Sequence, residues 1–258
     1  MVDGIAFNDL GEGPAVVLLH GHPFDRSLWD PQTRPLTQAG FRVIAPDLRG
    51  YGASVTTGGT VLMRELADDI VALLDRLGIA TAAAIGISMG GLVAMEFALE
   101  YPERLWALGL VATTAEPVTD AERATRYEQA DAAERQGMEP LVRTMKEGLY
   151  GPNCPTEVIE RVDGMMRSNN PVGAAAALRG RAERPDYRPK LADVRVPCLV
   201  CAGDADFWST PQVTQQLIDC LPSPRTLLLA NVGHLPNLEA SVRFNAELVA
   251  FLREARRR

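Results

Sequence analysis

The sequence feature that most constrains the fold is a Gly-Ile-Ser-Met-Gly pentapeptide at residues 86–90. It follows the apolar run of residues 82–85, and residues 91–98 after it have helical rather than strand character. The chain must therefore pass from a strand to a helix through a turn so sharp that only small residues fit two positions either side of the serine. The N–H groups after the serine then stand at a helix N-terminus, where negative charge is stabilised. We predict that Ser88 is a nucleophile and that the N–H of Met89 forms half of an oxyanion hole.

Short β-type runs alternate with helical stretches along much of the chain. Between two such runs, residues 63–77 place apolar side chains at helical spacing, and Gly78 follows where the helix is expected to end. Continuous apolar strands suit a parallel sheet covered by helices on both faces. The pattern predicts an α/β fold with a mostly parallel central sheet flanked by helices. Its strands are expected at residues 15–19, 41–45, 82–87, 108–112, 196–202 and 225–229.

The alternation stops between residues 116 and 190, where charged, Ala-rich and Met-rich helical segments follow one another. We interpret residues 116–190 as a helical cap inserted after the strand that ends near Ala112. Residues 1–115 and 191–258 would then form the core domain. A chain of 258 residues with 47% hydrophobic content is large enough for one such domain with an insertion.

Composition excludes several function classes. The net charge of -7 argues against a nucleic-acid surface, which needs clustered Lys and Arg. No secretory signal segment and no apolar run of about 20 residues occur, so we expect a soluble, cytoplasmic protein with no membrane partner. The pair Cys198 and Cys201 lies in a predicted buried strand, which argues against a redox or zinc role.

A nucleophilic serine needs a base, and the chain contains only three histidines. His234 follows the last predicted strand, in a loop from which its imidazole could reach Ser88 at the carboxyl edge of the sheet. An orienting carboxylate should follow the preceding strand at the same edge, and Asp206 is our first choice. Asp204 is the competing candidate, although it could simply stabilise the turn. Glu116 is the third candidate.

The second half of the oxyanion hole should come from the loop after an early strand, where His20-Gly21-His22-Pro23 stands. The backbone N–H of His22 is the candidate donor, because Gly21 allows close approach to a substrate. We expect the His20 side chain to pack under the loop. The His22 side chain could either line the pocket or only support it. The two histidines lack a third ligand nearby, so we expect no metal site and no cofactor.

These motifs together resemble the α/β-hydrolase superfamily. The resemblance covers nearly the whole chain outside the cap, and within the superfamily it is greatest to small cofactor-free bacterial esterases, lactonases and haloperoxidase-like enzymes. It implies a triad in the order Ser, Asp, His. Haloalkane dehalogenases, fluoroacetate dehalogenases and epoxide hydrolases of this superfamily use an aspartate at the position of Ser88, so the serine argues against all three. Two features depart from the pattern: His22 replaces a usual aromatic or hydrophobic residue, and the segment before Ala15 is short for the usual opening hairpin. The motifs that carry the resemblance are HGHP at 20–23, DLRGYGAS at 47–54, GISMG at 86–90, GDAD at 203–206 and GH at 233–234.

The expected function is hydrolysis of a small carboxylic ester or lactone through an acyl-enzyme, by a monomer or homodimer. One alternative is a ligand-binding receptor of the same superfamily with slow turnover. Another is a perhydrolase or haloperoxidase-like enzyme, in which hydrogen peroxide replaces water.

The substrate pocket is expected to be apolar and adaptable. Its candidate lining residues are Met145, Met165, Met166, Phe207 and Trp208. A substrate carboxylate could be bound by a cap arginine, for which the candidates are Arg126, Arg143, Arg167 and Arg179. Each of these arginines could equally be a solvated helix charge.

Overall fold

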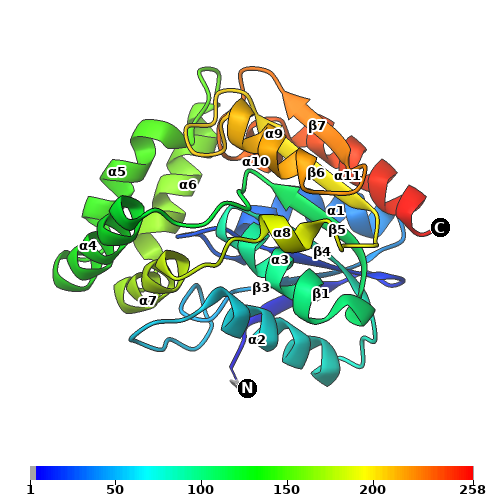
Figure 1. The fold of residues 1–258 in the computed structure, drawn as a ribbon, viewed down its shortest axis with the longest axis horizontal. Coiled ribbons are helices and arrows are strands. Elements are labelled where there is room, and N and C mark those ends of the chain that lie inside the picture. The colour runs from blue at the N-terminus through cyan, green and yellow to red at the C-terminus, as the bar shows by residue number, and fades with distance from the viewer. Residues whose placement is uncertain (1–3, 258) are drawn as a thin grey trace.

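The structure is a computed structural model that describes residues 4–257. Seven strands form one sheet in the order β1-β3-β2-β4-β5-β6-β7, and every neighbouring pair is parallel except β1 with β3. This confirms the predicted α/β class with a mostly parallel sheet (Figure 1). The strands are β1 (Phe7–Leu10), β2 (Ala15–Leu19), β3 (Arg42–Pro46), β4 (Ala82–Ile87), β5 (Leu105–Val111), β6 (Cys198–Gly203) and β7 (Arg225–Leu229).

The sequence pattern did not predict strand β1, and it placed the start of β5 three residues too late. β1 is four residues long and only partly buried, so it carries no apolar run; it is recognised by its antiparallel pairing with β3 at the edge of the sheet. β5 begins at Leu105 rather than near residue 108, because its first residues pair with Ala82 and Ala83 of β4. β2, β4 and β6 are buried along their whole length, which explains their continuous apolar sequence.

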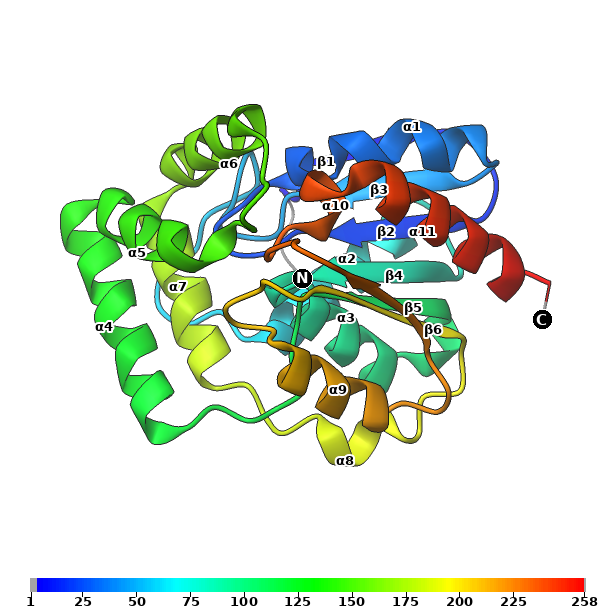
Figure 2. The same ribbon diagram turned by 90° about the horizontal axis from the view of Figure 1, so that it is seen from above.

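Helices cover both faces of the sheet. Helices α1 (Asp30–Gln38) and α11 (Ser241–Ala255) pack together on one face, while α2 (Met63–Arg76), α3 (Met89–Glu100) and α9 (Pro211–Asp219) lie on the other (Figure 2). α2 ends as the sequence predicts, because Gly78 adopts a left-handed φ of 66° directly after the C-cap residue. The remaining short helices are η1 (Arg26–Trp29), η2 (Pro102–Arg104), α8 (Arg188–Leu191) and α10 (Pro236–Glu239).

Four long helices, followed by the short α8, occupy the region between β5 and β6. They are α4 (Asp120–Gln136), α5 (Glu139–Leu149), α6 (Thr156–Ser168) and α7 (Pro171–Ala182), and they lie together beside one end of the sheet (Figures 1 and 2). α4 packs against α7, and the buried residues of both helices include several alanines, which allow close approach.

α7 is pressed against the loop that precedes α2. A Cβ atom on Gly173 would collide with the backbone of Gly50, and one on Gly180 would collide with the carbonyl oxygen of Val61. The N–H of Val61 also donates to the carbonyl oxygen of Ala176, at 3.0 Å. These contacts fix the position of α7, and therefore of the arginines at its C-terminal end, relative to the sheet.

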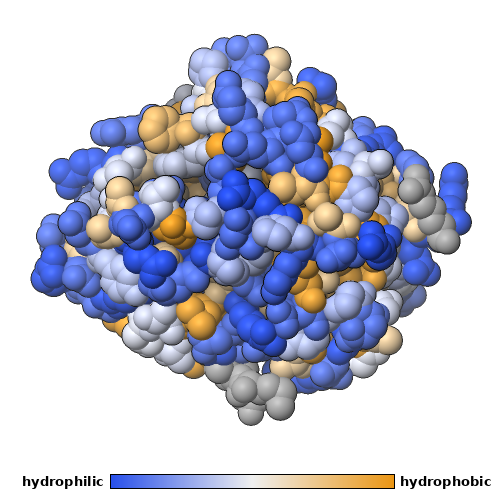
Figure 3. Space-filling model, viewed as in Figure 1, coloured by the Kyte–Doolittle hydropathy of each residue, from blue (hydrophilic) through white to orange (hydrophobic). Residues whose placement is uncertain are grey.

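The surface is mostly polar. Hydrophilic residues dominate the face seen in Figure 3, and hydrophobic residues on it are scattered in small groups. Within residues 4–257, no helix is both long enough and apolar enough to cross a membrane.

Candidate active site

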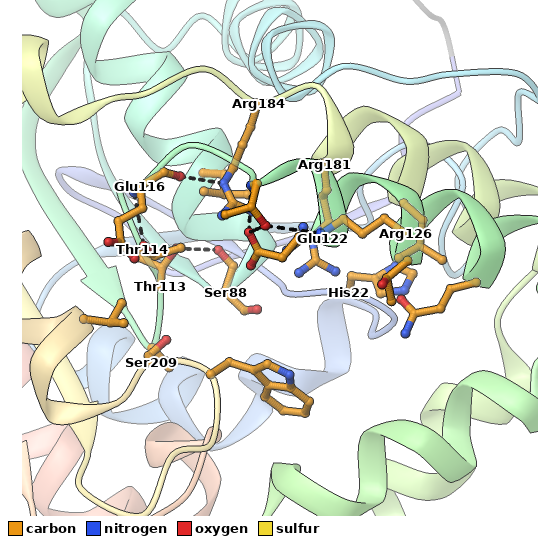
Figure 4. Close-up of a pocket in the computed structure, with 18 of the residues that line it drawn as sticks. His22, Ser88, Thr113, Thr114, Glu116, Glu122, Arg126, Arg181, Arg184 and Ser209 are labelled. Carbon is orange, nitrogen blue, oxygen red and sulfur yellow. Dashed lines mark hydrogen bonds between the residues drawn. The ribbon is translucent and has the colours of Figure 1, made fainter.

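Ser88 stands at the turn between β4 and α3, in a backbone conformation that non-glycine residues rarely adopt, with φ 54° and ψ -115°. The flanking glycines make this turn possible. A Cβ atom on Gly86 would collide with the carbonyl oxygen of Gly90, and one on Gly90 would collide with that of Leu19. The Thr113 hydroxyl donates to the Ser88 carbonyl oxygen at 2.8 Å, so the strained residue is held on its backbone side (Figure 4).

His234 and Asp206 are hydrogen-bonded to each other. Nδ1 of His234 lies 2.7 Å from Oδ2 of Asp206, and both side chains are buried. The other carboxylate oxygen, Oδ1, accepts from the backbone N–H groups of Trp208 at 2.8 Å and Ser209 at 3.0 Å. Burial by itself opposes ionisation of Asp206, but His234 and these N–H donors outweigh it and hold the pKa of this carboxyl below its usual value.

The two other acid candidates have different surroundings. Asp204 is exposed, and its carboxylate accepts from the N–H of Asn231 at 2.6 Å, so it ties the turn after β6 to the turn after β7. Glu116 lines the same cavity as Ser88, and its backbone carbonyl oxygen accepts from Nε of Arg184 at 2.9 Å. Of the three candidates, only Asp206 is hydrogen-bonded to His234 within the described residues.

Glu239 holds the loop that carries His234, a role that the sequence pattern did not reveal. Its carboxylate accepts from the N–H groups of Gly233 at 3.1 Å and Leu235 at 3.2 Å, on either side of the histidine. It also accepts from the N–H of Gly151 at 2.8 Å, which joins this loop to the segment after α5. The N–H of His234 itself donates to the carbonyl oxygen of Leu149.

Ser88 and His234 line one cavity of about 780 Å³, a volume typical of small-molecule sites. The loop after β2 contributes His22, the loop after β6 contributes Trp208, and α5 contributes Met145. Trp208 packs edge-on against the imidazole of His234, with ring centroids 4.9 Å apart.

Five residues of the expected site are not among the side chains that line this cavity, and one of them, Asp206, reaches it only through its hydrogen bond to His234. Met165 and Met166 are buried within α6, and Phe207 is 70% exposed and lies against α5 at Gly148. Met89 is buried at the first position of α3, directly after Ser88, so its backbone rather than its side chain is relevant to an oxyanion. The sequence shows which cap residues are apolar, but it does not show which of their side chains face the cavity.

The His22 side chain lines the cavity and is held in place by a hydrogen bond to Tyr51. Its Nδ1 lies 2.6 Å from the Tyr51 hydroxyl, while its Nε2 is buried and has no hydrogen-bond partner among the described residues. Burial and the nearby Arg181, His20 and Arg126 lower its pKa well below the usual value, so the ring is neutral near pH 7.

His20 packs under the same loop, as expected. Its Nδ1 donates to the carbonyl oxygen of Gly21 at 2.8 Å, and its Nε2 accepts from the N–H of Leu48 at 2.9 Å. The imidazole therefore joins the loops that follow β2 and β3, and it is fully buried. Its role is to position the loop that carries the N–H of His22.

Four arginines line the cavity, and only Arg126 was a candidate from the sequence; Arg188, from α8, is paired with Asp186. Arg126 comes from α4, Arg181 from α7 and Arg184 from the segment after α7 (Figure 4). The other candidates have surface positions instead. Arg167 pairs with Glu139, Arg179 pairs with Asp131 and Glu134, and Arg143 is exposed.

Within residues 4–257, no group of three or more His, Cys, Asp or Glu side chains could hold a metal ion. Cys198 and Cys201 are both buried in β6, and burial raises the pKa of each thiol, that of Cys198 to about 12. Both thiols are therefore protonated at neutral pH.

Comparison with known proteins agrees with this architecture. The sequence profile of the alpha/beta hydrolase fold matches residues 14–241. 3-Oxoadipate enol-lactonase 2 of Acinetobacter baylyi is 30% identical over 93% of this chain and 89% of the relative. A 2-hydroxy-6-oxononadienedioate/2-hydroxy-6-oxononatrienedioate hydrolase of Burkholderia vietnamiensis is 30% identical over 96% and 91%.

Among solved structures, a thermophilic esterase from Thermogutta terrifontis, determined with malate bound, superposes with a TM-score of 0.95. It is 36% identical, and the match covers 97% of this chain and 93% of the esterase. These similar proteins are all hydrolases by name. The profile spans most of the chain, and the structure contains the predicted sheet, turn and order of motifs. The chain therefore belongs to the α/β-hydrolase family, within which it resembles the enol-lactonase and haloperoxidase group.

Proposed function

We propose that this protein is a serine hydrolase that cleaves a small carboxylic ester or lactone through an acyl-enzyme. Ser88 is the nucleophile, His234 the general base and Asp206 the residue that orients and stabilises the imidazolium. The observation that carries the proposal is the buried His234–Asp206 hydrogen bond on the cavity that also holds the strained Ser88. Nδ1 of His234 is occupied by Asp206, so Nε2 is the nitrogen left to exchange a proton with Ser88.

The reaction would proceed in two halves. Oγ of Ser88 attacks the carbonyl carbon and its proton passes to Nε2 of His234, while the N–H groups of His22 and Met89 stabilise the oxyanion. The tetrahedral intermediate collapses, and His234 gives the proton to the leaving oxygen; with a lactone, that oxygen stays attached to the acyl group. Water then attacks the acyl-enzyme by the same proton transfers, and Ser88 is regenerated.

We further propose that residues 116–190 act as a cap over a core of residues 1–115 and 191–258. In this arrangement the core supplies the reacting groups and the cap supplies selectivity. The position of α5 supports this division, because Met145 of that helix lines the cavity together with Ser88 and His234. Met145 and Trp208 would contact the substrate, whereas Met165, Met166 and Phe207 would act indirectly.

Replacement of the nucleophile tests the proposal. Ser88→Ala should lower kcat/KM for 4-nitrophenyl butyrate by at least about 10³-fold, because the variant lacks the hydroxyl that forms the acyl-enzyme in this mechanism. A fluorophosphonate probe should label the wild-type protein and not this variant. Ser209→Ala is the matched control at a second cavity serine and should remain labelled. Labelling that persists in Ser88→Ala would refute the serine mechanism, and stoichiometric binding without repeated turnover would favour a receptor instead.

A further inference from the structure

The cavity wall contains buried and half-buried arginines that form no ion pair with a carboxylate. Arg126, Arg181 and Arg184 all line the cavity, and within residues 4–257 none of them forms an ion pair with a carboxylate. Nη1 of Arg126 and Nε of Arg181 are buried and make no hydrogen bond with the described residues. Donors left unpaired away from water are costly, so a protein rarely retains them without a ligand or a function.

The nearest acidic side chain is already engaged. Glu122 attracts Arg126, Arg181 and Arg184, but its carboxylate accepts from the N–H and hydroxyl of Thr119 at 2.9 and 3.0 Å. This pair forms the capping box at the start of α4. The carboxylate is therefore held by the helix terminus, and its single charge offsets only part of the charge of the three arginines.

The charges also repel one another. Burial, together with the neighbouring Arg126 and Arg184, lowers the pKa of Arg181 to about 9; burial and Arg126 lower that of Arg184 to about 10. The charged side chains around the cavity are four arginines and two glutamates, Glu116, Glu122, Arg126, Arg181, Arg184 and Arg188. The cavity is thus electropositive in a chain whose net charge is -7. A bound anion would relieve the repulsion among the arginines, and the positive potential of the cavity would attract it.

His22 supplies another unpartnered polar atom on the same cavity. If the Tyr51 hydroxyl donates to Nδ1 across 2.6 Å, then Nε2 carries the hydrogen and is a free donor. Arg126 and Arg181 are close enough to His22 to lower its pKa, so the three groups share one region. Figure 4 shows His22, Arg126 and Arg181 beside the part of the cavity that contains Ser88.

We propose that Arg126 and Arg181, assisted by His22, bind a carboxylate of the substrate, so that the preferred ester or lactone is an anion. Guanidinium groups suit this task because they bind carboxylates by paired, charge-assisted hydrogen bonds. This proposal rests on the proposed function for the identity of the substrate, but not for the existence of the anion site. The packing of α4 against α7, and of α7 against the core at Gly180, places both guanidinium groups on the wall.

The binding test uses the Ser88→Ala protein and glutarate, a small dicarboxylate, as the probe. Glutarate should raise the thermal unfolding temperature of this protein above that in chloride at equal ionic strength. Arg181→Met and Arg126→Met, each combined with Ser88→Ala, should weaken glutarate binding by about tenfold or more, because each removes charged hydrogen bonds. Arg143→Met, at an exposed position of α5 away from the cavity, is the matched control and should not change binding.

Stability separates a binding role from a structural one. A half-buried charge without an ion-pair partner does not stabilise the fold, so Arg181→Met should leave the unfolding temperature without glutarate unchanged or raised. Absence of glutarate binding, or binding that persists in both arginine variants, would overturn the anion site. A lowered unfolding temperature in Arg181→Met would also contradict it, because the arginine would then be structural.

Turnover links the anion site to the substrate. The value of kcat/KM for 4-nitrophenyl hydrogen glutarate, which carries a carboxylate, should exceed that for 4-nitrophenyl pentanoate by about tenfold or more. Arg181→Met should remove this preference. If glutarate binds as described but neither ester is hydrolysed, the serine hydrolase proposal fails and the anion site stands. If the neutral ester is hydrolysed equally well, the selectivity proposal fails and the hydrolase proposal stands.

Discussion

Asp206 and Asp204 are two residues apart in one loop, yet their surroundings give them different tasks. Asp206 is buried against His234, whereas Asp204 is exposed and accepts from the N–H of Asn231. Replacing Asp206 with Asn should lower kcat by about 10⁴-fold, because an amide cannot hold His234 in the tautomer that accepts a proton at Nε2. Asp204→Asn should lower kcat far less and act mainly on stability.

Steady-state kinetics of the two variants, together with their unfolding temperatures, check this ranking. Equal losses of kcat would mean that the loop acts as a unit and that Asp206 has no special role. A larger loss in Asp204→Asn would transfer the orienting role to that residue.

Helices α5 and α6 both carry methionines, but they present them differently. Met145 of α5 lines the cavity, whereas Met165 of α6 is buried and does not line it. Met145→Ala should therefore shift the acyl chain-length preference by about 1–3 kcal/mol in relative kcat/KM, the usual value of a few methylene contacts. Met165→Ala should instead lower the free energy of unfolding by about 2–5 kcal/mol, because it leaves a cavity in the packing of α6.

The measurement is a series of 4-nitrophenyl esters from acetate to octanoate, with chemical denaturation of both variants. A changed preference in Met165→Ala with an unchanged one in Met145→Ala would show that α6, rather than α5, shapes the pocket.

The free energy of unfolding of the whole molecule should depend on pH because two buried histidines, His20 and His22, are neutral in the folded state. Burial is the main cause that lowers the pKa values of His20 and His22 below the ordinary 6.5, so the unfolded chain binds protons that the folded chain does not. Unfolding free energy should therefore fall as pH drops below about 6.5, by up to about 1.4 kcal/mol per pH unit for each histidine. The lowered pKa of Asp206 adds a loss only at more acidic pH, where that carboxylate becomes protonated.

Denaturant unfolding at several pH values between 7.5 and 5 measures this dependence. His22→Phe removes one titrating group, and its stability should change less steeply with pH than that of the wild type. An identical slope in the two proteins would mean that His22 is not excluded from protonation in the fold.

Much of the fold could be predicted because it depends on local rules. Buried parallel strands must be apolar throughout, and a serine in a left-handed conformation between strand and helix needs glycines around it, so β2, β4 and the turn at Ser88 are visible in the sequence. Strand β1 was missed because its only strong signal is its pairing with β3. The adjacency of His234 and Asp206 follows from strand order, since both residues come after neighbouring parallel strands.

The wall of the cavity depends on packing between distant segments, and sequence spacing does not encode it. Met145 and Met165 lie on similar amphipathic helices, and only the placement of α5 and α6 separates cavity lining from buried packing. Arg179 and Arg181 are two residues apart on α7 and therefore lie on different sides of the helix. Arg179 pairs with Asp131 and Glu134, whereas Arg181 lines the cavity. Local sequence fixes the order and chemistry of the motifs, whereas the direction of each side chain is fixed by the long-range contacts that hold its helix.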